Sequence, residues 1–259
     1  MPYYLCLQLI LIMPFTLSHI AFALPIKRLW SDKISSTGLV IGSMLPDVEY
    51  YLRMRMYGTW GHTLMGIVLY ELILGVLIAY IFHGMIKTPL LDHMPLYIKS
   101  KYNKAYALDW NMYFREHWVK IIVSLYLGIL THLFWDIFTH EEGYIFGINI
   151  SWVDSLIGGY PIHSWLQLIL SLMGMIVILG YIARPTVETV HSVETGSSKL
   201  MFWSVVFILF VIFYSIRAYV GIPEEKYWIQ HMVISTSSII LALFFAALIA
   251  KLTSIFEVA

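Results

Sequence analysis

The stretch Leu130–Glu141 reads LTHLFWDIFTHE and ends an apolar run that begins near Trp118. An apolar run of this length, with charge confined to Lys120 and Asp136 near its ends, predicts a membrane-spanning helix. His132, Asp136 and His140 follow one another at intervals of four residues, about one helical turn, so they share one helix face with Cβ atoms ~6 Å apart. A carboxylate between two imidazoles indicates a metal site or a proton relay, the alternative being a helix end whose polar side chains reach the water interface.

The composition excludes a soluble protein. Of 259 residues, 59% are hydrophobic and 12% charged, with a mean hydropathy of +0.77, whereas about 25% of the residues in a soluble domain are charged. The apolar runs are long and continuous, which favours helices over barrel strands. A formal net charge of zero gives no reason to expect a nucleic-acid partner. Because Cys6 is the single cysteine, His and carboxylate side chains would have to hold any metal.

The expected fold is an all-α, polytopic transmembrane bundle in one membrane domain, residues 1–259. It has five spans plus an N-terminal apolar helix, with a motif-bearing core at 13–183 and two packing helices within 200–252. The spans are expected at Leu64–Ile86, Trp118–His140, His163–Ala183, Leu200–Val220 and Ile229–Leu252.

The N-terminal segment leaves two interpretations open. Residues 1–24 contain no Lys, Arg, Asp or Glu, so they could form a first span. Alternatively the chain begins at Met13, and Pro14 and Pro25 bracket a segment that is too short to span, which would be re-entrant or interfacial. His19 lies in this segment and, taken alone, is typical of a core residue.

A polar connection, expected over 26–61, contains the motif GSMLPD at residues 42–47. The proline holds Leu45 extended, which predicts a helix break just before Asp47. Asp47 could cap the next turn or direct its carboxylate at a metal, and Glu49 is a weaker candidate for the same role.

Several polar residues lie within the next spans or at their ends. His62 opens the second apolar run, and Glu71 lies inside it, ~13 Å along a helix axis from His62. That separation is too large for a shared metal, so Glu71 is expected to be an interior polar residue near the site. Gln167 lies on the polar face of a later span, and Glu141 adjoins His140.

Threading the chain through a bilayer brings the candidates to one membrane face. If 26–61 lies on side A, then His19, Asp47, His62, His132 and Asp136 all lie near that side. Side B carries nine of the sixteen Lys and Arg residues, which favours a cytoplasmic side B by nine to seven. These nine are Lys87, Lys99, Lys101, Lys104, Arg115, Lys120, Arg184, Lys199 and Lys251.

Four motifs carry a resemblance to a known family: MPFTLSH (13–19), IGSMLPDVEY (41–50), GHT (61–63) and THLFWDIFTH (131–140), with Gln167, Ser171 and Gly174 matching Q-x-x-x-S-x-x-G. Together they resemble an uncharacterised bacterial integral-membrane family, domain of unknown function 4184, over Met13–Ala183. The family typically begins at the methionine of MPFT, which supports a start at Met13.

The motif order is also similar to that of inner-membrane metal-dependent hydrolases and, more distantly, zinc phospholipase C. This similarity implies His19, Asp47, His62, His132 and Asp136 as metal ligands. The chain departs from the pattern where such proteins often have Asp-x-Pro, since it has Glu71 and Ile73.

These observations predict a membrane-embedded hydrolase that uses a divalent metal, zinc in the first instance, with manganese and iron also suited to such ligands. Asp47 or Glu141 would act as the base, with Glu71, His140 and Gln167 around the ligands. The substrate would be a lipid or lipid-linked ester or phosphoester in the bacterial inner membrane, with membrane lipids as the expected partners. The alternatives are an ion-coupled transporter or proton relay, and a non-catalytic structural or assembly protein.

Overall fold

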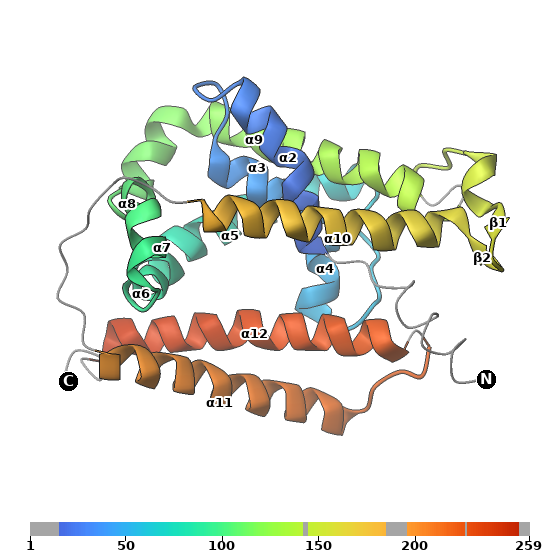
Figure 1. Ribbon diagram of the computed structural model, residues 1–259. Helices are drawn as coiled ribbons and strands as arrows, with labels where there is room; N and C mark the ends of the chain where they lie inside the picture. Colours follow the sequence, from blue (N-terminus) through green and yellow to red (C-terminus); the bar gives the residue numbers. More distant parts are fainter. Residues whose placement is uncertain (1–15, 142–144, 185–195, 226, 254–259) are drawn as a thin grey trace. The chain divides into compact units, whose positions relative to one another are not determined.

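The computed structural model describes residues 16–141, 145–184, 196–225 and 227–253, which are almost entirely helical (Figure 1). Within these residues, five helices are long and apolar enough to cross a membrane, namely Gly66–Asp92, Trp110–Thr139, Ile162–Ala183, Ser198–Val220 and Tyr227–Leu252. The all-α fold with five spans is therefore confirmed. Residues 1–15 lie outside the described part, so the expectations for the first span and for Met13 stay predictions.

The elements follow one another in this order: η1 (Thr16–Ser18), α2 (His19–Leu29), α3 (Ser36–Gly42), α4 (Leu45–Arg53), the π-helix η2 (Gly66–Glu71), α5 (Leu72–Ile81), the π-helix η3 (Phe82–Ile86), α6 (Lys87–Asp92), α7 (Leu96–Lys101), α8 (Asn103–Tyr106), α9 (Trp110–Thr139), η4 (Ser151–Asp154), β1 (Leu156–Ile157), β2 (Tyr160–Pro161), α10 (Ile162–Ala183), α11 (Gly196–Val220) and α12 (Tyr227–Leu252). The strands form an antiparallel hairpin that turns at Gly158 and Gly159, both at positive φ.

The chain divides into two compact units. Unit 1 contains 1–50, 57–77 and 117–181, and unit 2 contains 51–56, 78–116 and 182–259. In unit 2, α11 and α12 pack along each other around Phe202, Val206, Ala242 and Ala246. All five residues expected to bind metal belong to unit 1. A division by contacts does not test the prediction of one membrane domain.

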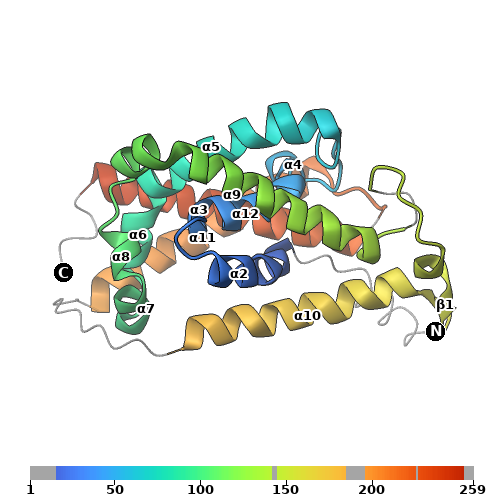
Figure 2. The same cartoon turned by 90° about the horizontal axis from the view of Figure 1, so that it is seen from above.

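In unit 1, α2 and α3 form a hairpin that lies along α9 (Figure 2). Helix α2 runs antiparallel to α9, since His19 at its start lies near Asp136, whereas Ile26 near its end packs with Leu127 against one apolar cluster. Helix α3 then returns parallel to α9. Gly38 lies against Ile121, Gly42 against Leu125, and Ser43 reaches His132.

The tip of this hairpin lies near Lys120 and Ser124, roughly two to three helical turns from His132 toward the N-terminus of α9. The Ser35 N–H donates to Ser124 Oγ at 2.8 Å, and the charge of Lys27 interacts with that of Lys120. If only segments of ~20 residues are counted as spans, all of 26–61 stays on side A. Helices α2 and α3 are shorter than that, with 11 and 7 residues. The structure instead carries the tip toward side B.

Moving the hairpin tip changes the charge balance between the two sides. Lys27, Arg28 and Lys33 then join the nine basic residues of side B, which makes twelve of the sixteen, so the positive-inside rule favours a cytoplasmic side B by a wider margin.

With Cys6 replaced, we expect an impermeant thiol reagent to label Gly158→Cys in intact cells, and to label Ser100→Cys and Asp32→Cys only after lysis. Labelling of Asp32→Cys together with Gly158→Cys in intact cells would contradict a hairpin tip on side B.

Candidate metal centre

The last turns of α9 supply two fully buried polar side chains. His132 and Asp136 are one turn apart, with relative exposures of 0% and 1% and 3.0 Å between Nε2 and Oδ2. The four-residue spacing in the sequence therefore produces a contact. Burial of an imidazole and a carboxylate without water demands polar partners from other elements.

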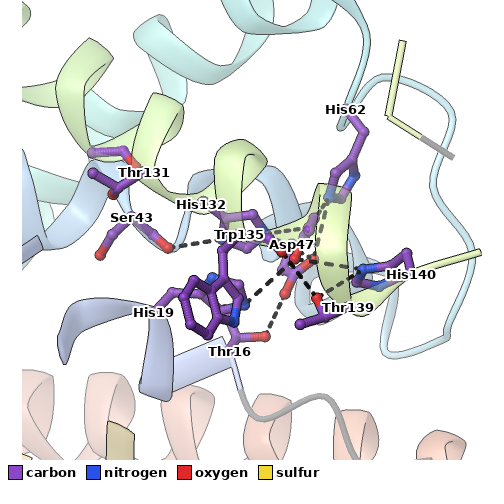
Figure 3. Close-up of polar contacts among 12 residues, drawn as sticks. Thr16, His19, Ser43, Asp47, His62, Thr131, His132, Trp135, Thr139 and His140 are labelled. Carbon is purple, nitrogen blue, oxygen red and sulfur yellow. Dashed lines mark hydrogen bonds and ion pairs between the residues drawn. The ribbon is translucent and has the colours of Figure 1, made fainter. Parts of the chain in front are cut away.

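Three other elements bring their side chains to this pair (Figure 3). His19, at the start of α2, stacks on His132 with ring centroids 3.9 Å apart, and its Nε2 lies 3.7 Å from Asp136 Oδ1. His62 Nε2 lies 3.2 Å from Asp136 Oδ2 and 3.8 Å from Asp47 Oδ1. Asp47 Oδ1 lies 3.7 Å from His132 Nε2. The structure thus brings together all five residues expected to bind metal; their role as ligands stays a prediction.

The donor atoms of this cluster fit a divalent metal. Two triplets, His19–Asp47–His132 and His62–His132–Asp136, each place three ligand atoms within 4.8 Å of one another. Three buried polar atoms, His19 Nδ1, His132 Nε2 and Asp136 Oδ1, make no hydrogen bond of normal geometry among the described residues, although His132 Nε2 lies close to Asp136 Oδ2. Buried polar atoms are normally satisfied, and imidazole nitrogen with carboxylate oxygen is a zinc donor set.

The orientation of His132 is set by a backbone carbonyl. Its Nδ1 lies 2.8 Å from the Ser43 carbonyl oxygen, which can only accept, so Nδ1 carries a proton and Nε2 is the ring nitrogen that faces Asp47 and Asp136. Such a hydrogen bond from the far ring nitrogen is typical of metal-binding histidines. Sequence reasoning missed Ser43, because its contribution comes from the main chain.

The motif GSMLPD is explained by the approach of α3 to α9. A Cβ on Gly42 would lie 2.2 Å from the Leu125 carbonyl oxygen, and one on Gly128 would lie 2.5 Å from that of Leu39. Helix α3 ends at Gly42, as the expected break requires. Leu45, however, is the first residue of α4 rather than an extended residue, since Pro46 occupies the first turn, where prolines are tolerated. Asp47 follows in that turn, where Thr16 Oγ1 donates to its Oδ2 at 2.5 Å.

Glu49 has a different role from the one expected. Its carboxylate accepts the N–H groups of Thr59, Trp60 and Gly61 at 2.8–3.0 Å and the Thr59 hydroxyl at 2.9 Å. It therefore clamps the loop that carries His62, whose φ of 63° is left-handed. Burial by itself raises the pKa of Glu49, but the hydrogen bonds from Gly61, Trp60 and Thr59 outweigh it and lower that pKa to about 2.

The substitution Glu49→Gln is expected to loosen the loop that carries His62. The amide NH₂ of Gln cannot accept the hydrogen bonds that residues 59–61 donate to the carboxylate, and the negative charge that strengthens these bonds is lost. We expect an apparent destabilisation of about 2 kcal/mol, the scale of hydrogen bonds to a charged group, and weaker metal binding, measured by thermal unfolding and metal titration. Glu116→Gln, which alters an exposed carboxylate of α9, is the control. Equal effects of the two substitutions would contradict the clamp.

The same clamp predicts an acid dependence. A carboxyl whose pKa is depressed from 4.5 to about 2 in the folded state stabilises that state above pH ~4.5, and loses this contribution as the pH falls toward ~2. The difference in stability between wild type and Glu49→Gln, measured without metal, should therefore shrink over this range.

The other predicted residues are placed as follows. His140 Nδ1 lies 3.5 Å from Asp136 Oδ1. Burial lowers the pKa of His140, although Asp136 and Asp47 act in the opposite direction. Gln167 is half-buried on α10 and makes no hydrogen bond in the described part of the chain, and Glu141 is exposed.

Glu71 is nearer to the cluster than the axial distance of a regular helix implies. That distance assumes one continuous helix from His62, whereas the chain turns at residues 58–63 and continues as the π-helix η2. Glu71 is completely buried, interacts electrostatically with His62 and His132, and has no hydrogen bond of normal geometry to its carboxylate oxygens among the described residues. π-Helical turns are frequent at functional sites.

Comparison with known proteins identifies a family of unknown function. No curated protein and no solved structure matches the chain. A family model described as "Domain of unknown function (DUF4184)" matches residues 13–254, which extends beyond the Met13–Ala183 resemblance to include α11 and α12. The protein, with its buried His and Asp cluster in unit 1, belongs to the DUF4184 family.

Proposed function

We propose that this protein is a metal-dependent hydrolase of the bacterial inner membrane, acting on a lipid or lipid-linked ester or phosphoester. The observation that supports the proposal is the convergence of three imidazoles and two carboxylates at the end of a candidate span, with buried N and O atoms that make no hydrogen bond of normal geometry among the described residues. The resemblance to inner-membrane metal-dependent hydrolases supports the same reaction class.

His19, His62, His132 and Asp136 would hold the ion, zinc in the first instance. A bound divalent ion supplies Lewis acidity and lowers the pKa of a coordinated water. Asp47 is the better candidate for the base, because its Oδ1 faces His62 and His132 at 3.7–3.8 Å while Thr16 fixes its Oδ2. Glu141, the other candidate, is exposed.

The test is hydrolysis by the purified protein in vesicles of defined phospholipids, with products identified by mass spectrometry. We expect activity that a chelator removes and zinc restores, and that Asp47→Asn lowers by at least ~10²-fold, the usual contribution of a general base. His163→Ala should retain it, since His163 pairs with Asp154 at 3.0 Å rather than with the cluster. Full activity in chelator, or in Asp47→Asn, would refute this mechanism.

The buried Glu71 favours ion-coupled transport as the second candidate. A buried carboxylate inside a span commonly marks a proton or ion pathway. Flux driven by a pH gradient in proteoliposomes, abolished by Glu71→Gln and present without hydrolysis, would select transport over the hydrolase.

A further inference from the structure

An apolar groove of about 370 Å³ lies between α2 and α9. Phe22 and Ile26 of α2 line one wall, and five residues of α9 from Leu127 to Trp135 line the other. This volume is at the lower end of the range for ligand pockets. The groove is built entirely within unit 1.

The lining suits a hydrocarbon rather than a polar ligand. Its single hydroxyl, Thr131 Oγ1, already donates to the Gly128 carbonyl at 2.7 Å. The indole N–H of Trp135 makes no hydrogen bond with the residues that the structure describes, and it is the remaining polar group of the lining side chains. Such a groove offers water almost nothing to bind, whereas an alkyl chain lying in it would bury apolar surface.

The groove is also open to the bilayer. Leu130 and Phe134, which line it, have relative exposures of 57% and 61% and belong to a candidate span. Apolar side chains exposed on a spanning helix face lipid tails, so a chain can enter laterally without crossing water.

One end of the groove meets the metal centre. Trp135 and Thr131 adjoin Asp136 and His132 in the chain, and Phe22 is one turn from His19. The stacked rings of Phe22 and Trp135, with centroids 3.6 Å apart, join the two walls at this end. A chain lying in the groove would therefore present its polar end to the cluster.

We propose that this groove holds one hydrocarbon chain of the substrate and so selects chain-bearing membrane lipids over water-soluble esters. The inference rests on the proposed hydrolase and adds how it would choose its substrate. In that reaction, water adds across the ester or phosphoester bond at the cluster: hydroxyl goes to the acyl carbon or phosphorus, and the proton goes to the leaving oxygen. The apolar product chain then leaves sideways into the bilayer.

A photoreactive lipid tests chain binding without relying on activity. Phosphatidylglycerol with a diazirine in one acyl chain would be mixed into phosphatidylcholine vesicles containing the full-length protein. After illumination, we expect the labelled peptides to be concentrated at 22–26 of α2 and 127–135 of α9. Leu130→Trp, which fills the groove from its exposed side, should reduce that labelling about tenfold, the effect of one misfit group in an apolar pocket.

Val123→Trp is the matched control. Val123 is 47% exposed on the same helix but does not line the groove, so its substitution should leave the labelling unchanged. In the same vesicles, Leu130→Trp should raise the KM for long-chain lipid about tenfold and leave hydrolysis of a short-chain analogue unaltered.

The two readouts separate the two proposals. Labelling spread evenly over all spans, or unaffected by Leu130→Trp, overturns the groove as a chain site even if the lipid is hydrolysed. Specific groove labelling without metal-dependent hydrolysis overturns the hydrolase, and with it the statement that the bound chain belongs to a substrate.

Discussion

Replacing His132 with alanine is expected to reduce bound metal from about one ion per chain to below a tenth of that value. His132 is the one residue common to both ligand triplets, so its loss leaves each with two donors, fewer than the three or four protein ligands of stable zinc sites. The carboxylates Asp47 and Asp136 would also lose the imidazole nearest to both. The measurement is metal content by mass spectrometry on protein purified in detergent, with zinc, manganese and iron analysed together.

Two controls make this result specific. His163→Ala removes an imidazole bonded to Asp154 and should keep the wild-type metal content. Size-exclusion elution and circular dichroism should show that His132→Ala still folds. A folded wild-type protein that carries no metal and takes up none from a zinc buffer would exclude the metal centre, and His132→Ala protein with a full complement of metal would exclude this ligand set.

Gly128→Ala is expected to destabilise the protein strongly, although it adds only one methyl group. The new Cβ would lie 2.5 Å from Leu39 O, 2.6 Å from Ser43 N and 2.7 Å from Gly42 C, all main-chain atoms that no rotamer change can move. Helix α3 must therefore shift away from α9, which costs about 3 kcal/mol on the scale of overpacked cores. Small residues at such crossings are what allow helices to approach closely in membranes.

The shift should also affect the cluster, because Ser43 and Asp47 follow α3 directly. We expect a lower thermal midpoint together with weaker metal binding, since the hydrogen bond that fixes His132 would lengthen. Gly180→Ala is the matched control, because a Cβ at that position on α10 meets nothing within 4 Å. A Gly128→Ala protein as stable as Gly180→Ala would mean that α3 does not lie against α9 in the way described.

Much of the fold follows from the sequence because hydrophobic length is a direct physical constraint. The five spans appear where long apolar runs occur, and His132 and Asp136 meet because four residues make about one turn. Following the chain through successive spans predicts that Asp47, His62 and His19 lie on one side of the membrane. It does not predict their distances from His132 and Asp136, since the sequence does not show which helices are in contact.

The remaining features lack a sequence signal for identifiable reasons. Ser43 acts through its carbonyl, which every residue possesses. Glu49 resembles a candidate ligand until the positions of three N–H groups are known. The helices α2 and α3 are too short to be predicted as spans, so the basic tip of their hairpin is predicted to be part of an ordinary loop. A regular helix from His62 would place Glu71 too far from the site, but the chain turns there and then forms a π-helix.

The hydrogen bond between His132 and Ser43 links positions 89 residues apart, and this has a consequence for biosynthesis. At about 5–20 residues per second, α9 leaves the ribosome several seconds after α3. During that interval α2 and α3 are already made, but the helix against which they pack does not yet exist. We therefore expect nascent chains that end before α9 to bind no metal. Metal binding would then begin late in synthesis, only after the first half of the protein has been inserted correctly.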